Sequence, residues 1–598
     1  MKKQQATRVA ERSVAYALKH AESNRHSGAC RNPAVEHLEL WSSDWLKKSA
    51  SGRGSNGKLS PYGIQKLREL ILELAVRGRL VPQDPSDEPA GVLLEKIAGE
   101  KVRLVKEGKI KRQKKLPEIT EEEKPFELPD GWEWVRVRQI CHDWGQKKPD
   151  QDFTYIDVSA IDNRSGRVVS PAVLTPDEAP SRARKIIQEG TVIYSTVRPY
   201  LKNIALVTEG FEPEPIASTA FAIVHPFSGI LGAYLISVFR SPPFIRYVES
   251  VQTGIAYPAI NDKQFFGAVI PLPPRAEQHR IVAKVDELMA LCDRLEQEQT
   301  DSRETHQTLV ETLLRTLVEA PNAETAQQAW QRIAQHFDLL FTTETAIDQL
   351  KQTILQLAVM GKLVPQDPND KPASVLLEKI AEEKARLVKE GKIKKQKKLL
   401  EITEDEKPFE LPYQWRWVRF GDVVNYKSEL VKPNEFIECD QVGPDSIEKD
   451  TGRLLFRRTV RESGVQGPNN RFYAGQILYS KIRPSLNKVW LADFDGLCSA
   501  DMYPLEPMTC PKYLVKTILS EVFLEQVRVA ENRVKMPKLN IDSLSNILIP
   551  VPPLAEQHRI VAKVDELMAL CDALKARIQE SETTQRHLAD AVVKRAVM

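Results

Sequence analysis

The sequence predicts a mixed α/β fold in which two globular modules are separated by long, paired antiparallel helices, in a circular arrangement with approximate two-fold symmetry. Three observations lead to this prediction. The chain has 598 residues, of which 42% are hydrophobic, so it is long and apolar enough for several domains with buried cores. Large parts of it occur twice, and the repeated parts include seams of apolar residues with helical spacing.

The duplication follows a regular order along the chain. Residues 67–137 align with 350–420 without a gap, with 53 identities in 71 positions, and residues 270–296 align with 549–575 with 23 identities in 27. The segments between them, 138–269 and 421–548, resemble each other only in short stretches. Constant and variable segments therefore alternate. If the two ends of the chain met in space, they would rebuild a second copy of the central constant block.

The constant segments read as long helices. After Pro273-Pro274, apolar residues recur in alternating steps of four and three, the spacing of a coiled-coil seam, at Ile281, Val285, Leu288, Cys292 and Leu295. The C-terminal copy repeats the pattern from Ile560 onward. Each helix could run for about 40 residues, or about 60 Å. An amphipathic helix packed on a single domain is the alternative, but two near-identical copies that each follow a variable module favour a spacer.

The variable modules combine strand and helix signals. Short runs of β-forming residues, such as 190–197 and 475–482, interleave with helical stretches, such as 233–241 and 512–527, which is typical of compact mixed domains. We therefore expect six parts: an N-terminal extension (1–66), a constant helical region (67–126), the first module (127–274), a central constant helical region (275–409), the second module (410–553) and a C-terminal constant helix (554–598).

Composition excludes several classes of protein. Lys and Arg (85) nearly balance Asp and Glu (82), for a formal charge of +3, so nucleic acid would not be held by bulk charge. The seven cysteines contain no C-x-x-C pair, which favours reduced thiols over a disulfide framework or a zinc site. No apolar stretch reaches the ~20 residues that span a bilayer. We expect a soluble, cytoplasmic protein with no membrane partner.

The motifs that resemble catalytic sites are incomplete. Gly52-x4-Gly57-Lys58 has the spacing of a phosphate-binding loop, but Leu59 replaces the Ser or Thr that would hold Mg²⁺. Ser241-Pro-Pro-Phe244 resembles the amine-gripping motif of amino-methyltransferases, but no convincing glycine-rich cofactor loop accompanies it. No metal-ligand spacing occurs around the histidines. We therefore expect a binding protein and not an enzyme.

Both variable modules contain a matched hairpin-like segment in which an arginine precedes a proline, at Arg198-Pro199 and Arg483-Pro484. Arginine beside a turn, with hydroxyls and aromatic rings nearby, suits contacts to phosphates and base edges; a structural turn with an exposed arginine is equally compatible. Further on, 253–258 and 533–538 occupy corresponding places before Asn261 and Asn540.

Each module has zero net charge, with 13 basic and 13 acidic residues in 138–269 and 17 of each in 421–548.

Over about residues 67–598, the chain resembles the specificity subunits of type I restriction-modification systems. The resemblance lies in AEQHRIVAKVDELMALCD at 276–293 and 555–572, each preceded by Ile-Pro-x-Pro-Pro, and in the openings LPDGWEWVRV (128–137) and LPYQWRWVRF (411–420). It implies that each module is a target recognition domain that reads one half of a split, asymmetric site in double-stranded DNA. The helices would set the gap between the halves.

The resemblance also implies partners. Two methyltransferase subunits would bring S-adenosylmethionine, and restriction subunits would bring ATP-dependent translocation and cleavage with Mg²⁺; this chain would carry no cofactor and no metal. The implied DNA-binding residues are Lys147, Lys148, Tyr194, Ser195, Thr196, Arg198, Lys202, Thr253, Tyr257, Tyr479, Ser480, Lys481, Arg483, Lys488, Arg533, Lys535 and Lys538. The implied partner-binding residues are Glu277, Gln278, Arg280, Glu556, Gln557 and Arg559. The alternatives are a scaffold with two protein-binding modules and a stand-alone DNA-binding regulator.

Overall fold

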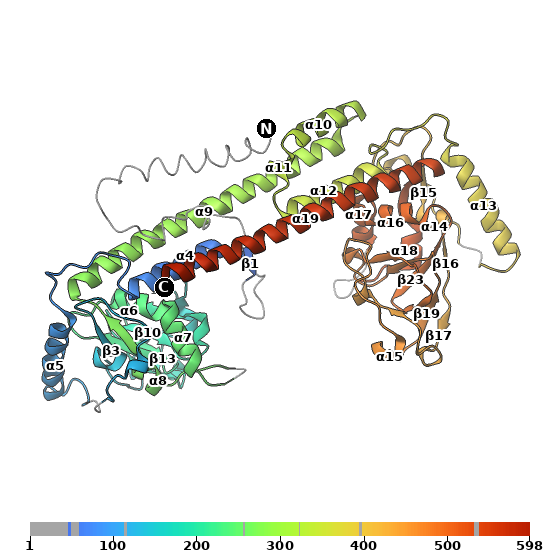
Figure 1. Ribbon diagram of the computed structural model, residues 1–598. Coiled ribbons are helices and arrows are strands. Elements are labelled where there is room, and N and C mark those ends of the chain that lie inside the picture. The colour runs from blue at the N-terminus through green and yellow to red at the C-terminus, as the bar shows by residue number, and fades with distance from the viewer. Residues whose placement is uncertain are drawn as a thin grey trace. The chain divides into compact units, whose positions relative to one another are not determined.

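The computed structural model describes residues 46–48, 59–112, 116–254, 257–321, 323–393, 397–530 and 537–597, and the chain divides into two compact units. The first unit comprises residues 1–302 and 582–598, and the second comprises 303–581. Each unit contains one variable module together with pieces of the constant regions (Figure 1). The predicted mixed α/β fold, with two sheet-rich modules and long helices, is confirmed.

The first module is built on two four-stranded sheets. One has the order β11-β10-β13-β4 and is antiparallel, and the other has the order β8-β5-β12-β9 and contains the parallel pair β5 and β12. The strands are β4 (Cys141–His142), β5 (Phe153–Ile156), β8 (Ala172–Leu174), β9 (Ala183–Ile186), β10 (Val192–Ser195), β11 (Ile204–Leu206), β12 (Pro215–Ser218) and β13 (Phe221–Pro226). A small hairpin joins β6 (Ile161–Asp162) to β7 (Arg167–Val168).

The second module repeats the order of the first sheet with a different sequence, but the parallel pair of its other sheet lies at an edge. Its sheets have the orders β16-β23-β20-β21 and β17-β19-β22-β18, and β18 and β22 form the parallel pair. The strands are β16 (Val424–Tyr426), β17 (Leu430–Val431), β18 (Gln441–Val442), β19 (Asn469–Phe472), β20 (Ile477–Ser480), β21 (Val489–Leu491), β22 (Gly496–Ser499) and β23 (Met502–Pro507). Two short helices, α14 (Phe420–Val423) and α15 (Val460–Ser463), belong to the same module.

The entry and exit of each module are held together by a two-stranded ribbon. In the first module, β3 (Glu133–Arg136) pairs antiparallel with β14 (Val269–Leu272), and in the second, β15 (Arg416–Arg419) pairs with β24 (Leu548–Val551). These four strands belong to the constant segments at the edges of the modules. Because the ribbon pairs the first and last strands of the module, the sequence between them can vary while the constant segments keep their positions.

Helices complete both modules. They are α6 (Gly232–Arg240), α7 (Pro242–Val251) and α8 (Asp262–Gly267) in the first module, and α16 (Pro511–Leu519), α17 (Glu521–Ala530) and α18 (Ile541–Asn546) in the second. A long helix follows each ribbon: α9 (Arg275–Glu319) has 45 residues and α19 (Leu554–Val597) has 44. The predicted length of about 40 residues is therefore confirmed. The predicted seam of α9, including Ile281, Val285 and Cys292, is buried in the core of the first unit.

The end of the chain packs on the N-terminal constant helix, as the duplication predicts. In the first unit, the Tyr62 hydroxyl of α4 (Tyr62–Val76) donates a hydrogen bond to Asp590 Oδ1 of α19 at 2.7 Å. Ala589 is fully buried in the core there. In the second unit, α12 (Glu344–Val359) shares a core with Val310 and Leu314 of α9. Both units are thus assembled from corresponding constant pieces.

Further helices belong to the constant regions. Helices α5 (Ala90–Lys106) and α13 (Ala373–Lys389) correspond to each other in the repeat, and each packs an apolar face on the core of its unit. The second unit also contains α10 (Ala323–Gln335) and α11 (Phe337–Leu340), and the first unit contains an N-terminal hairpin of β1 (Leu46–Lys48) and β2 (Leu59–Pro61). Among the described residues, no helix is long and apolar enough to cross a membrane.

Candidate nucleic-acid interface

The predicted arginine–proline pairs form strained corners at the same place in both modules. Arg198 follows β10 and Arg483 follows β20, and each begins a short 3-10 turn whose first residue is the proline. Their φ angles are 48° and 45°, in the left-handed region, and Lys202 and Asn487 at the far ends of the turns also have positive φ. Such backbone costs roughly 1–3 kcal/mol for a residue other than glycine and concentrates at functional sites.

A second segment of each module holds its corner in place. The backbone N–H of Arg198 donates to Pro258 O at 2.8 Å, and that of Arg483 donates to Pro537 O at 2.9 Å. These prolines belong to the segments that the sequence placed in correspondence. The two modules therefore build the same pair of adjoining loops, although their sequences differ.

The first corner presents an arginine and tyrosines to solvent. Arg198 is exposed, and its guanidinium carbon lies 5.0 Å from the centre of the Tyr257 ring, which is 69% exposed. Tyr200, on the same turn, is 48% exposed. Thr253 is exposed beside them, where its backbone N–H donates to Ala259 O. This surface offers a fork of charged donors together with aromatic faces, which suits phosphates, base edges and stacking.

The second corner is more basic. Arg483 is exposed, and Lys481 and Lys538 flank Asp501, with their Nζ atoms 3.9 and 3.4 Å from Asp501 Oδ1. Lys481 also lies 5.6 Å from the centre of the Tyr503 ring. Two lysines of this corner thus lie beside one carboxylate. The predicted residues Arg533 and Lys535 lie outside the described residues.

Five of the predicted DNA-binding residues are buried, which corrects the expectation for them: Tyr194, Ser195, Thr196, Tyr479 and Ser480. They lie on, or directly after, interior strands of their sheets, where both faces are covered. The Tyr194 ring packs against Phe265, with the ring centres 4.6 Å apart.

The buried hydroxyls bond to the protein's own backbone. Ser195 Oγ donates to Val197 O at 2.9 Å, and Ser480 Oγ donates to Ile482 O at 3.0 Å. Thr196 Oγ1 donates to Ala220 O at 2.8 Å. These side chains shape the corners but do not reach the surface.

The other predicted lysines differ in their surroundings. Lys147 pairs with Glu214, a hydrogen bond that raises the pKa of the lysine, and Lys148 beside it is exposed. Lys202 is half-buried at the end of the first corner. Lys488 turns inward, where its Nζ donates to Pro444 O. The structure therefore brings together one group of predicted residues in each module. In the first module the group is Arg198, Lys202, Thr253 and Tyr257, and in the second it is Lys481, Arg483 and Lys538. Lys147 and Lys488 do not belong to these groups.

The predicted partner-binding residues are mostly internal, which is a second correction. Glu277, Gln278, Glu556 and Gln557 are each 1% exposed or less. Gln278 Oε1 accepts the backbone N–H of Leu231 at 2.9 Å, and Gln557 Oε1 accepts that of Cys510 at 3.2 Å. These four buried side chains therefore join the start of each long helix to the module that precedes it.

Arg280 and Arg559 remain partly exposed, but each is held by a constant aspartate. Arg280 Nη2 lies 2.6 Å from Asp87 Oδ2, and Arg559 Nη2 lies 2.7 Å from Asp370 Oδ2. The hydrogen bond to the aspartate raises the pKa of each arginine. The matched pairs fix the loop that precedes α5 or α13 to the start of the long helix.

The chain is similar over nearly its whole length to known proteins of one family. A model of the type I restriction modification DNA specificity domain matches residues 412–582. The type I restriction enzyme EcoAI specificity subunit of Escherichia coli is 40% identical over 94% of this chain and 99% of its own length. The EcoEI specificity subunit of the same species is 39% identical over the same shares. The chain belongs to the type I restriction enzyme specificity subunits.

Solved structures are similar to this specificity subunit as well. One that concerns complex assembly and conformational transition of the type I R-M system covers 79% of this chain and 99% of the solved chain, with 24% identity and a TM-score of 0.49.

The Ser241-Pro-Pro-Phe244 motif lies between two helices of the first module. Ser241 is buried, and its Oγ donates to Val238 O at 2.6 Å, while the prolines after it begin α7. Ser520 makes the same bond to Thr517 O at 2.6 Å in the second module. The motif is therefore a junction between two helices. Gly52–Lys58 lies outside the described residues, and no cluster of metal-ligating side chains occurs in the described ranges.

Sequence reasoning missed one contact between each recognition module and its long helix. A six-residue turn, DNRSGR at 162–167 and EKDTGR at 448–453, carries an arginine that reaches carboxylates of the helix: Arg164 approaches Glu296 of α9, and Arg453 pairs with Asp572 of α19. A usable signal was present in the sequence, because both turns have the same length and end in Ser/Thr-Gly-Arg.

Proposed function

We propose that this chain is the DNA sequence-specificity subunit of a type I restriction-modification complex, and that its two modules read the two halves of an asymmetric site. The observation that carries this proposal is the pair of strained, exposed Arg–Pro corners at corresponding positions of two modules with different sequences. Membership of the specificity subunit family supports it. Since the surroundings of Arg198 and Arg483 differ, the two half-sites should differ.

The chemistry of the corners fits base reading in the major groove. A guanidinium can donate two hydrogen bonds to the O6 and N7 atoms of guanine, and each such pair contributes roughly 1–3 kcal/mol of discrimination. The modules carry no net charge, so the local groups at the corners must supply the specificity while partner subunits supply much of the phosphate contact.

We propose two equivalent methyltransferase partners that bring S-adenosylmethionine, together with restriction subunits that bring ATP and Mg²⁺. The repeated helices α5 and α13 support the number two. Several exposed residues are identical in both, including Arg103 and Arg386, and Lys106 and Lys389. Core packing does not demand identity at exposed positions, whereas contact with two copies of one partner does. This chain contributes specificity, and its partners contribute the chemistry.

Co-expression with the cognate methyltransferase, followed by base-resolution mapping of methylated adenine, tests the proposal. We expect one split motif whose two halves differ. Replacing residues 421–548 with the second module of another family member should change one half of the motif and leave the other half and the gap unchanged. A change in both halves would contradict independent reading, and the absence of any methylation motif that depends on this chain would contradict the proposed function.

A scaffold or a stand-alone regulator would behave differently in the same system. A scaffold would leave the methylation motif unchanged when a module is replaced. A regulator would bind its site tightly as the isolated chain, without the methyltransferase, which is measured by titrating labelled DNA at several salt concentrations.

A further inference from the structure

Each recognition module touches its long helix through a turn that we call the anchor turn, residues 162–167 in the first module and 448–453 in the second. The flanking residues pair in the same way, Ile161 with Val168 and Ile447 with Leu454. Both turns contain a glycine in the left-handed region, Gly166 with φ of 69° and Gly452 with φ of 75°. Most of the sequence of the two modules differs, so a shared turn of equal length points to a shared requirement.

In the first unit, the anchor turn and a constant helix grip the same two carboxylates of α9. Arg164 Nη2 lies 2.8 Å from Glu296 Oε2 and 3.6 Å from Asp293 Oδ1. From the other side, Arg68 Nη2 of α4 lies 2.7 Å from Asp293 Oδ1 and 3.1 Å from Glu296 Oε2. The two carboxylates are thus bound between the constant frame and the variable module.

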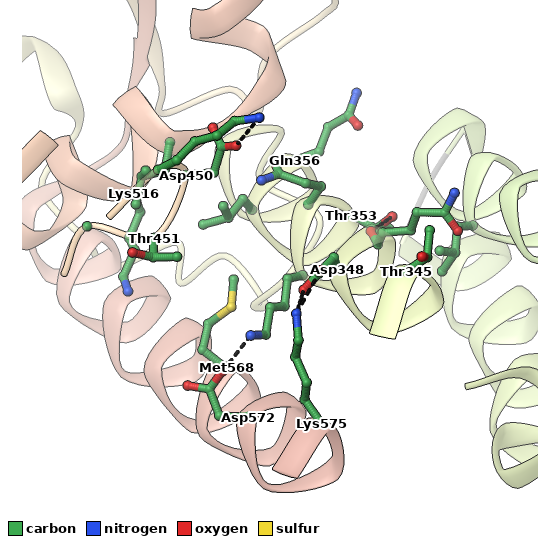
Figure 2. Close-up of a pocket in the computed structure, with 18 of the residues that line it drawn as sticks. Thr345, Asp348, Thr353, Gln356, Asp450, Thr451, Lys516, Met568, Asp572 and Lys575 are labelled. Atoms are coloured by element: carbon green, nitrogen blue, oxygen red, sulfur yellow. Dashed lines mark hydrogen bonds and ion pairs between the residues drawn. The ribbon is translucent and has the colours of Figure 1, made fainter. Parts of the chain in front are cut away.

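The second unit builds the corresponding contact. Asp572, which aligns with Asp293, pairs with Arg453 of the anchor turn and with Lys351 of α12. Burial alone would raise the pKa of Asp572, but the hydrogen bond from Lys351 and the two cations outweigh it and lower the pKa. Figure 2 shows Asp572 of α19 and Asp450 and Thr451 of the turn around one groove. The carboxylate therefore stays ionised between its two cationic partners at neutral pH.

The arginine comes from different places in the two turns, the third residue in the first and the sixth in the second. Duplication of one ancestral turn would place the arginine at the same position in both copies. A requirement for the contact with the helix explains why an arginine is present at different positions. Both turns also contact helices of their own modules. Arg240 Nη1 of α6 donates to Arg164 O at 3.2 Å, and a Cβ added to Gly452 would lie 3.3 Å from Leu519 Cδ1 of α16. An anchor turn therefore transmits the orientation of its module to the helix.

We propose that Arg164 and Arg453 are positioning residues that fix the rotation of each recognition module on its long helix and thereby set the permitted gap between the two DNA half-sites. This inference rests on the proposed function. One base pair changes the separation of two half-sites by about 3.4 Å and their relative rotation by about 35°. A module free to rotate on its helix would tolerate a gap one base pair shorter or longer.

The test uses the full chain with its methyltransferase subunits and maps adenine methylation at base resolution. The variants are Arg164→Ala, Arg453→Ala and the double variant. We expect unchanged half-sites and an increase of about fivefold in methylation of sites whose gap differs by one base pair, since an exposed ion pair contributes up to about 1 kcal/mol. Arg164→Lys and Arg453→Lys should restore most of the discrimination, because they keep the charge.

A matched control lies in the first anchor turn itself. Arg167 is exposed, and no ion pair joins it to α9 among the described residues; Arg167→Ala should keep the wild-type gap. Wild-type gap discrimination in the double variant would overturn the proposal. So would a uniform loss of methylation at all sites with the gap preference intact, which would indicate a phosphate contact. A wild-type chain that directs no sequence-specific methylation would instead contradict the proposed function.

Discussion

Trp132, directly before β3, donates a hydrogen bond from its indole Nε1 to Glu277 Oε2 at 2.9 Å, and this contact joins the start of the first module to the first turn of α9. Gln83 Nε2 donates to the other carboxylate oxygen at 3.0 Å. Trp415, Glu556 and Gln366 repeat the arrangement in the second unit, at 2.9 and 3.1 Å. A buried carboxylate with both oxygens bonded therefore connects the module, the helix and the constant loop in each unit.

Replacing Glu277 by Ala should destabilise the first unit by about 2–3 kcal/mol, because the substitution leaves the buried Trp132 and Gln83 donors without their charged acceptor. Thermal unfolding should show the loss as a lower Tm for that unit. Glu287→Ala is the control, since Glu287 lies on the same helix, 65% exposed and paired with Lys284. Equal Tm values for the two variants would contradict the structural role of Glu277.

The same carboxylates should make stability depend on pH. Burial raises the pKa of Glu277 and Glu556 above the ordinary 4.5, against the opposing hydrogen bonds from Gln83 and Gln366. A carboxyl with a raised folded pKa contributes stability that is present below the unfolded pKa and is lost as pH rises through the folded pKa. The double variant Glu277→Gln and Glu556→Gln should lose less stability than wild type between pH 4.5 and 8.

Urea unfolding midpoints across that pH range measure the difference between the two proteins. A steeper loss of stability in the double variant than in wild type would contradict the assigned sign.

Arg198→Gly separates the strain of the corner from its chemistry. Glycine adopts a φ of 48° without steric cost, so relief of about 1 kcal/mol or more of strain should offset the greater flexibility of glycine. Stability should be no lower than in wild type. Recognition of one half-site should fall about tenfold or more, because the guanidinium is lost. Arg483→Gly should do the same for the other half-site.

Methylation at each half-site and the Tm are the two measurements for the corner variants. A glycine variant that keeps full recognition would show that the arginine is only part of a turn. Arg198→Lys should recover part of the binding but not the base preference, since an ammonium cannot bond bidentately with a fixed geometry.

Tyr257→Ala should weaken recognition of the first half-site by about twofold to fivefold, because the ring no longer orients Arg198 by stacking, an interaction of about 0.5–1 kcal/mol at an exposed site. Tyr257→Phe keeps the ring and tests whether the hydroxyl contributes. Competition binding with half-site variants measures both. An effect of Tyr257→Ala on the second half-site would contradict the local role.

Inserting seven helical residues at corresponding places in both long helices, between 302 and 303 and between 581 and 582, should change the gap that is methylated, and sites with the wild-type gap should no longer be methylated efficiently. The insertion adds about 10.5 Å of helix, whereas a base pair adds about 3.4 Å. The half-sites should not change. Methylation mapping checks this, and an unchanged gap would show that the long helices do not determine the spacing.

The sequence by itself determined the duplicated plan, the mixed fold and the long helices, because repeats and apolar spacing are properties of neighbouring residues. The matched segments also located Arg198 and Arg483 and the loops that hold them. The family resemblance rested on the same local text, and similarity to family members over 94% of the chain agrees with it.

Only the tertiary structure decided which of the candidate side chains reach the surface. Glu277 and Trp132 are 145 positions apart, and Tyr194 is buried because distant helices cover its sheet. Exposure depends on contacts between segments that are remote in sequence, so a polar residue in a repeated motif cannot be assigned to a partner surface or to the core from its neighbours alone. The left-handed backbone of the corners and the grip of Arg164 and Arg453 on the helices depend on the same long-range packing.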